Sequence, residues 1–160
     1  MGKKSNSSPE KTGPATVLNR RARFDYEILE TLEVGLVLVG SEVKSIYQGR
    51  ANLTDAYCVV RQDELWLINA DVEPYEKASH YLQERRRDRK LLAHRKEITL
   101  LTRKSQEKGL AILPLKLYFS RGKVKVEIGL GRGKKQYDKR ESIAKKETQR
   151  ELDRARSEKY

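Results

Sequence analysis

The sequence of 160 residues has one cysteine, few aromatic side chains and no long apolar run. With Cys58 alone, the chain can form neither an internal disulfide nor a cysteine-based metal site. The longest apolar run, residues 34–40, is far shorter than the ~20 residues that span a membrane. Residues 1–9 have basic side chains with no apolar segment behind them, so we expect no signal peptide. These absences favour a soluble, cytoplasmic protein.

Positive charge is in excess, and it is concentrated at the two ends of the chain. Lys and Arg number 35 against 23 Asp and Glu, which gives a net charge of +12. Residues 1–23 carry six basic groups and one acidic group, and residues 132–160 carry eleven and six, so the segment between them is nearly neutral. Basic arms on a near-neutral domain are typical of proteins that bind polyanions, most often nucleic acid.

The central segment has the alternating pattern of short antiparallel strands. We predict a strand from Phe24 that continues through 36–39, and a hairpin of 56–60 with 65–68. A second hairpin joins 113–119 to 124–130, with an edge or bulge at Pro114. About six short strands without βαβ alternation favour a mainly β fold, a small OB-like antiparallel β-barrel with flanking α-helices, over a sandwich.

Two helices and two flexible ends complete the predicted organisation. One helix covers residues 42–48 with Ser41 as its N-cap, and a longer one runs from Asp88 to a stop at Gly109. The predicted divisions are a disordered basic N-terminal arm (1–18), an OB-like RNA-binding barrel (19–131) and a basic C-terminal tail (132–160). The tail has good helix formers but a thin apolar stripe, so we expect disorder when free and a helix over 138–158 beside a partner.

Catalysis has little support in the sequence. His80 and His94 lie in different segments and neither is paired with a nucleophile, while Cys58 fits a core position in a strand. The glycines of 129–134 lack the spacing of a Walker A loop or a dinucleotide fingerprint. We therefore expect no enzyme activity, no cofactor and no metal.

Three basic clusters stand out, at residues 19–23, 85–87 and 133–135. On the last hairpin, strand alternation places Lys116 and Tyr118 on one outward face together with Lys123 and Lys125. A basic face with an aromatic side chain suits contact with a phosphate backbone and stacking on bases. The combination indicates an RNA- or DNA-binding protein.

Five ordered segments resemble the SmpB (small protein B) family, the bacterial partners of transfer-messenger RNA (tmRNA). These segments are Asn19–Arg23, Gly40–Ile46, Gly49–Leu53, Arg89–Leu92 and Gly133–Arg140, and their order and spacing match over roughly residues 15–141. Phe24 departs from the family, because many relatives have a histidine there. The resemblance implies an OB-like barrel that binds the tRNA-like domain of tmRNA and stands in for its missing anticodon arm.

The resemblance also implies residue roles. The implied RNA-binding positions are Arg20, Arg21, Arg23, Glu33, Lys90, Leu92, His94, Lys123, Gly133, Lys134 and Lys135. The tail positions implied to face the ribosomal decoding region are Tyr137, Asp138, Lys139, Arg140 and Ile143. The implied function is delivery of tmRNA to stalled ribosomes for trans-translation, by a monomer in a 1:1 RNA complex whose tail probes the empty mRNA channel of the small subunit. A generic OB-fold protein that binds single-stranded RNA or the ribosome is the alternative.

Overall fold

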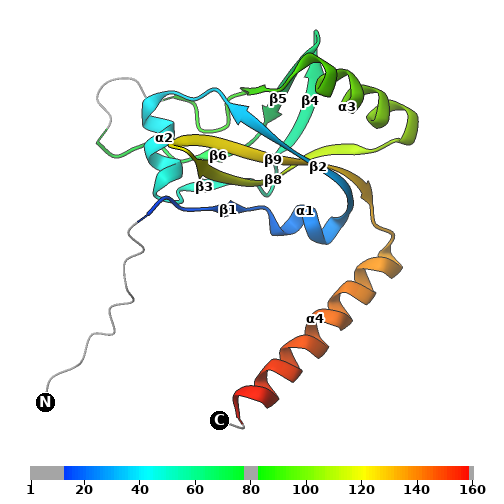
Figure 1. Cartoon of the computed structure of the whole chain (residues 1–160). Helices are drawn as coiled ribbons and strands as arrows, with labels where there is room; N and C mark the ends of the chain where they lie inside the picture. Colours follow the sequence, from blue (N-terminus) through cyan, green and yellow to red (C-terminus); the bar gives the residue numbers. More distant parts are fainter. Residues whose placement is uncertain (1–12, 78–82, 159–160) are drawn as a thin grey trace, which may run out of the picture.

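A closed antiparallel barrel forms the body of the protein. The computed structural model describes residues 13–77 and 83–158, and Figure 1 shows the barrel with helices outside it. The sheet order is β1-β8-β4-β5-β7-β2-β9, and a further pairing of β8 with β9 closes the ring. The strands of this sheet are β1 (Val17–Leu18), β2 (Tyr26–Leu36), β4 (Tyr57–Arg61), β5 (Glu64–Ile68), β7 (Arg89–Leu92), β8 (Ala111–Ser120) and β9 (Lys123–Gly133). This architecture confirms the predicted OB-like barrel.

The two predicted hairpins are both present. Strands β8 and β9 pair from Ala111↔Gly131 to Ser120↔Lys123, with a register shift after Pro114 where we predicted an irregularity. Their inward side chains include Leu117, Val126 and Ile128, each at most 1% exposed. In the β4–β5 hairpin, Gln62 and Asp63 both have positive φ angles, which suits a two-residue turn. Period-2 alternation was therefore a sound guide to these four strands.

The start of the barrel differs from the predicted strand at Phe24. Residues Arg20–Asp25 form the short helix α1, and the strand begins at Tyr26. Asn19 caps α1 by accepting a hydrogen bond from the Ala22 N–H at 3.1 Å. The Asn19 side chain also donates to the Pro114 carbonyl at 2.8 Å, which fixes α1 to the barrel. Six residues are too few to show a helical period, so the sequence pattern missed this helix.

The prediction of one helix from Asp88 was wrong, because that stretch contains a strand and then a helix. Strand β7 pairs with β5 and β2, and Leu91 is buried as a strand residue. Helix α3 (Arg95–Lys108) begins after His94, whose N–H donates to the Glu97 carboxylate at 2.8 Å. As predicted, α3 ends at Gly109, which has a φ of 60°. The apolar pair Leu91–Leu92 fits either period, and tertiary pairing decides between them.

Helix α2 (Gly40–Tyr47) is tied to β7 by a buried ion cluster. Its predicted cap, Ser41, was wrong: the Glu42 carboxylate accepts from the Val39 N–H at 3.1 Å and so starts the helix earlier. Glu42 also accepts from Arg89 Nε at 2.7 Å and from the Arg87 guanidinium. Burial opposes ionisation of Glu42, but hydrogen bonds from Arg87, Val39 and Arg89 prevail and lower its pKa. The charged cluster thereby fastens α2 over the barrel.

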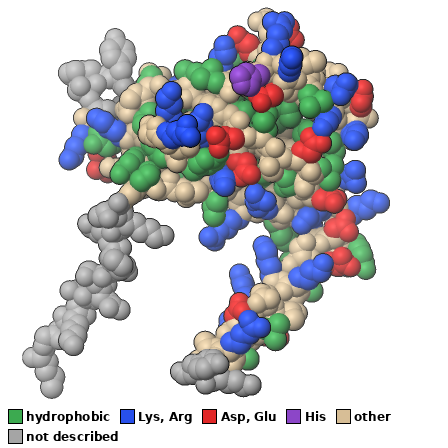
Figure 2. Space-filling view, in the orientation of Figure 1, with side chains coloured by type: hydrophobic (Ala, Val, Ile, Leu, Met, Phe, Trp, Pro, Cys, Tyr) green, Lys and Arg blue, Asp and Glu red, His purple; other side chains and the backbone are tan. Residues whose placement is uncertain are grey.

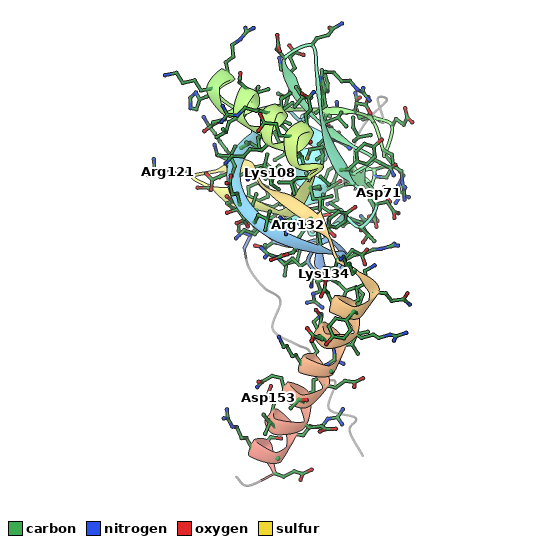
Figure 3. The ribbon with its side chains drawn as sticks, turned by 90° about the vertical axis from the view of Figure 1, so that its right-hand side faces the viewer. Asp71, Lys108, Arg121, Arg132, Lys134 and Asp153 are labelled. Carbon is green, nitrogen blue, oxygen red and sulfur yellow. The ribbon has the colours of Figure 1, made fainter. Side chains whose placement is uncertain are left out.

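The two predicted arms of the chain both contain regular structure. In the N-terminal arm, Val17 and Leu18 pair with β8, so the predicted disorder does not extend to them, and residues 1–12 lie outside the described part. At the other end, α4 (Gln136–Ser157) is a helix close to the predicted range of 138–158. It projects from the barrel as a helix of about 33 Å (Figures 1 and 3).

The two remaining strands, β3 (Ala51–Asn52) and β6 (Asp71–Val72), pair with each other beside α2.

Candidate nucleic-acid interface

The structure brings six predicted RNA-binding residues together around α1. We call Arg20, Arg21, Arg23, Gly133, Lys134 and Lys135 the α1 cluster. Gly133 is the register partner of Tyr26 at the end of β9, and the Lys134 N–H donates to the Asp25 carbonyl at 2.9 Å. Two basic segments more than 100 residues apart in the sequence therefore form one surface.

The arginines of the α1 cluster are held loosely. Arg21 lies 3.4 Å from Asp25 and 3.7 Å from Asp55, and Arg23 lies 3.9 Å from Glu127. The two arginine side chains are more than half exposed. Exposed ion pairs of this kind contribute about 0–1 kcal/mol. The guanidinium groups can therefore exchange a carboxylate for an RNA phosphate at little cost.

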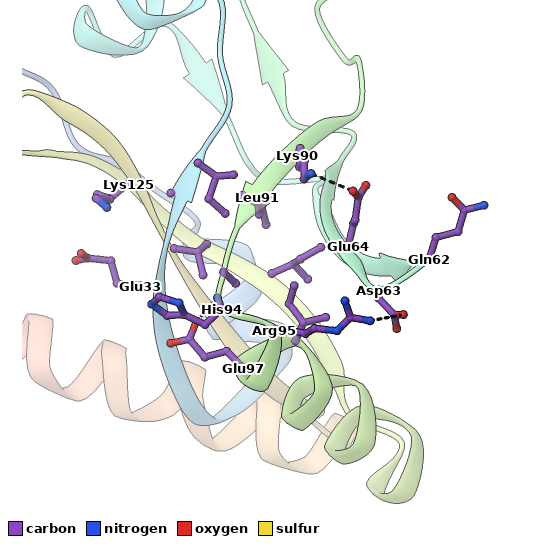
Figure 4. A pocket seen from close by; sticks show the side chains of 16 residues that line it. Glu33, Gln62, Asp63, Glu64, Lys90, Leu91, His94, Arg95, Glu97 and Lys125 are labelled. Atoms are coloured by element: carbon purple, nitrogen blue, oxygen red, sulfur yellow. Dashed lines mark hydrogen bonds and ion pairs between the residues drawn. The ribbon is translucent and has the colours of Figure 1, made fainter.

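Four other predicted residues line a single groove between β2, β7 and the start of α3. Glu33, Lys90, Leu92 and His94 come from these three elements, and with Lys125 they border a space of about 700 Å³. Figure 4 shows Glu33 and Lys125 on one side of this groove and Glu64 on the other. Lys90 Nζ is 3.0 Å from the Glu64 carboxylate. We call this space the β2–β7 groove.

An exposed leucine gives the β2–β7 groove an apolar contact. Leu92 is 54% exposed and lines the groove together with the charged Glu33 and Lys90. Its register partner is Gly35, where an added Cβ would be 3.3 Å from the Leu92 Cβ. The missing side chain at Gly35 thus leaves room for Leu92, whose flat aliphatic surface suits packing against a base or ribose.

The outward face of the last hairpin is less basic than we predicted. Lys116 and Tyr118 do point outward, but Glu127 and Glu33 share their face. Lys116 Nζ lies 3.4 Å from Glu127 and 5.0 Å from the centre of the Tyr118 ring, and the Tyr118 hydroxyl donates to Glu33. Burial, followed by this bond to Glu33, raises the pKa of Tyr118 to about 12. Glu33 therefore has a partner within the protein.

Lys123 is separate from both groups of predicted RNA-binding residues. It begins β9 at the turn of the β8–β9 hairpin, where it pairs with Ser120. It borders neither the α1 cluster nor the β2–β7 groove. Of the eleven predicted positions, ten thus fall into two groups and one lies apart.

Two arginines of the basic run at 85–87 make close ion pairs within the fold, and the third is more loosely paired. Arg85 makes two hydrogen bonds to Asp71 at 2.9 and 3.0 Å, and Arg87 binds the buried Glu42. Arg86 lies 3.8 Å from Asp55. These partners lie 14 to 45 residues away in the sequence, so the run alone suggested a free basic patch where the fold pairs the charges.

The tail helix is attached to α1 through one face. Lys139 Nζ lies 3.3 Å from Asp25, and Lys146 Nζ lies 5.6 Å from the centre of the Phe24 ring. Lys134 Nζ also contacts the Ser142 hydroxyl at 3.1 Å. The predicted tail residues Tyr137, Asp138, Arg140 and Ile143 are exposed. Sequence reasoning missed Lys146 and gave Phe24 no role. The seven-residue spacing of Lys139 and Lys146 puts both on one face of a helix, but only the structure shows that this face lies opposite α1.

Charge of both signs covers the visible surface. Figure 2 shows Lys and Arg side chains along α4 and over the barrel, interspersed with Asp and Glu. Within residues 13–77 and 83–158, no group of three His, Cys, Asp or Glu side chains is placed to hold a metal ion. In the same part of the chain, no helix has both the length and the apolar character to cross a membrane. Of the other candidates for catalysis, His80 lies outside the described residues. Burial raises the pKa of the Cys58 thiol, which keeps it protonated.

The closed barrel, the two groups of predicted RNA contacts and the attached basic helix define the class of protein: a small basic protein built on an OB-like fold. The family described as "SmpB protein" matches residues 16–158. The SsrA-binding protein of Syntrophobacter fumaroxidans is 55% identical over 98% of this chain and 96% of its own length. That of Desulforudis audaxviator is 52% identical over 92% of this chain and 94% of its own.

A solved structure gives the same result. A chain described as "tmRNA-SmpB: a journey to the center of the bacterial ribosome" is 46% identical, with a TM-score of 0.65, over 80% of this chain and 94% of that one. The chain belongs to the SmpB family. The resemblance seen in five sequence segments is thereby confirmed.

Proposed function

We propose that this chain binds transfer-messenger RNA and delivers it to stalled ribosomes for trans-translation. Family membership and the tmRNA–SmpB complex among its structural relatives support this role. The observation that carries it is the convergence of Glu33, Lys90, Leu92 and His94, from three elements, on one groove. A groove lined by cations, carboxylates and an exposed apolar side chain can bind folded RNA by phosphate, hydroxyl and base contacts together.

The two groups of residues have different roles in this proposal. The α1 cluster neutralises phosphates, because its guanidinium and ammonium groups are only weakly paired within the protein. The β2–β7 groove binds an unstacked nucleotide, with Leu92 against its base or ribose and Lys90 on its phosphate. Together they hold the tRNA-like domain where an anticodon arm would otherwise extend.

The tail acts on the ribosome. Tyr137, Asp138, Lys139, Arg140 and Ile143 face the decoding region of the small subunit, and the rest of α4 lies in the vacant mRNA channel. A helix of about 33 Å with basic side chains on several sides suits a narrow channel lined by RNA. An mRNA that fills the channel excludes the helix, so the tail reports vacancy. The protein acts by binding and has no catalytic role, and its work on ribosomes places it in the cytoplasm.

A comparison of the affinities for two RNAs tests this proposal. The protein is titrated with tmRNA and with an elongator tRNA over a salt series, with each affinity fitted against the logarithm of salt concentration. We expect tight 1:1 binding to tmRNA and much weaker binding to the tRNA at every salt concentration. Equal, weak binding to both RNAs, or equal binding to arbitrary single strands, would instead indicate a generic OB-fold RNA-binding protein.

A further inference from the structure

A line of four charged side chains and one tyrosine connects the β2–β7 groove to the α1 cluster. From the groove it runs through Glu33 on β2, Tyr118 and Lys116 on β8, and Glu127 on β9 to Arg23 on α1. Each neighbour is joined by a contact: hydroxyl to carboxylate, ammonium over ring, ammonium to carboxylate, and guanidinium to carboxylate. The two RNA-binding groups are therefore linked across the outward face of three strands.

The strand register explains why Tyr118 reaches Glu33. Glu127 on β9 lies between Glu33 and Lys116, and Lys125 lies between Gly35 and Tyr118. Tyr118 crosses β9 diagonally to place its hydroxyl on the Glu33 carboxylate. The contact crosses two strand spacings, about 9.5 Å, so it requires the combined length of the Tyr118 and Glu33 side chains.

Glu33 is the one acidic member of the predicted RNA-binding set, and its side chain is exposed. A free carboxylate on an exposed strand samples several rotamers, and an RNA donor must select one of them. A hydrogen bond from Tyr118 to one oxygen removes much of this freedom and leaves the remaining lone pairs for a hydroxyl or amine of the RNA. The raised pKa of Tyr118 agrees with a hydroxyl that stays protonated and donates.

We propose that Tyr118 is a positioning residue for RNA binding, which acts by holding the Glu33 carboxylate at the edge of the β2–β7 groove. This inference rests on the proposed function. Tyr118 acts through Glu33, so its contribution to RNA affinity exists only while Glu33 is present. Lys116, placed over the Tyr118 ring and beside Glu127, keeps the ring in this orientation.

A double-mutant cycle with the full chain and tmRNA tests this role. Tyr118→Phe removes only the hydroxyl, and we expect it to weaken tmRNA binding about fivefold to tenfold, the effect of one lost hydrogen bond. Glu33→Ala weakens binding by more. In the Glu33→Ala background, Tyr118→Phe has no further effect. Tyr57→Phe, at a 45% exposed tyrosine on β4, is the matched control and leaves affinity unchanged.

The salt dependence of tmRNA binding separates positioning from the loss of a phosphate contact. The dependence of affinity on salt keeps its slope in Tyr118→Phe, because no cation is removed. Wild-type affinity in Tyr118→Phe, or the same loss in both Glu33 backgrounds, would overturn the inference. A wild-type protein with no preference for tmRNA over tRNA overturns the proposed function instead, so the two failures are distinct.

Discussion

The buried Glu42–Arg89 pair makes a sharp prediction for the variant Glu42→Gln. Arg89 is 1% exposed, and it donates to Glu42 at 2.7 Å, to the Ala70 carbonyl at 2.8 Å and to the Arg85 carbonyl at 3.0 Å. Glutamine removes the only negative charge in this set and turns an amide N–H₂ toward the guanidinium donors. Leaving a buried charge uncompensated costs about 3–5 kcal/mol. That is a large part of the roughly 5–15 kcal/mol that stabilises a domain.

A carboxylate-to-amide change at the surface provides the control. Asp63 pairs with Arg95 at 3.3 Å, but both side chains are more than three-quarters exposed. We expect Asp63→Asn to cost less than about 1 kcal/mol, since asparagine also tolerates the positive φ of this turn position. Urea unfolding of the two variants measures both values. Equal, small losses in the two variants would refute the reasoning that burial makes the Glu42 pair important.

The Glu42–Arg89 pair also makes the free energy of unfolding depend on pH. The pKa of Glu42 is lower in the folded protein than its ordinary value of 4.5, so ionised Glu42 favours the folded state. This contribution is complete above pH 4.5 and is lost as the pH falls toward the lower folded pKa. The stability difference between wild type and Glu42→Gln therefore shrinks in that window. A difference that stays constant from neutral pH to pH 3 would contradict this assignment.

Three further changes have defined outcomes. Gly129→Ala should lower the free energy of unfolding by about 1–3 kcal/mol in urea titrations, because its Cβ would lie 2.9 Å from a Leu115 methyl; unchanged stability would argue against the tight packing there. Asp25→Asn removes the partner of Lys139, so amide hydrogen exchange in the first turns of α4 should accelerate, and unaltered exchange would show that this contact does not hold the helix. Arg21→Gln should reduce the salt slope of tmRNA binding by about 0.7–0.9, and an unchanged slope would remove Arg21 from the phosphate contacts.

Sequence periodicity was sufficient for the parts of the fold whose partners are local. The β8–β9 hairpin alternates strictly and turns within a few residues, so each strand predicts the other. The boundary between β7 and α3 could not be found in this way. Arg89 looks like one more basic residue at a helix start, and its burial depends on Glu42, which lies 47 residues away.

In the candidate site too, the residues that are close in the sequence could be predicted, and the contacts between distant strands could not. Basic runs marked the α1 cluster, because its members are close in the sequence within each segment. The β2–β7 groove depends on the register of β2 against β7, and the family resemblance, not periodicity, singled out Glu33 and Leu92. The contact of Tyr118 with Glu33 spans 85 residues and three strands, and no pattern in the sequence signals it. The tail helix was predicted in extent, but its attachment to α1 required the structure.

The central claim is that the barrel binds tmRNA and the tail acts on the ribosome. Deleting residues 138–160 tests it most directly. This segment carries eight basic and six acidic residues, so its loss removes little net charge and leaves the residues of the α1 cluster and the β2–β7 groove in place. We expect tmRNA affinity to stay within about threefold of wild type at matched salt, while tagging of peptides on stalled ribosomes is abolished. Lost tmRNA binding, or tagging that persists without the tail, would contradict the account.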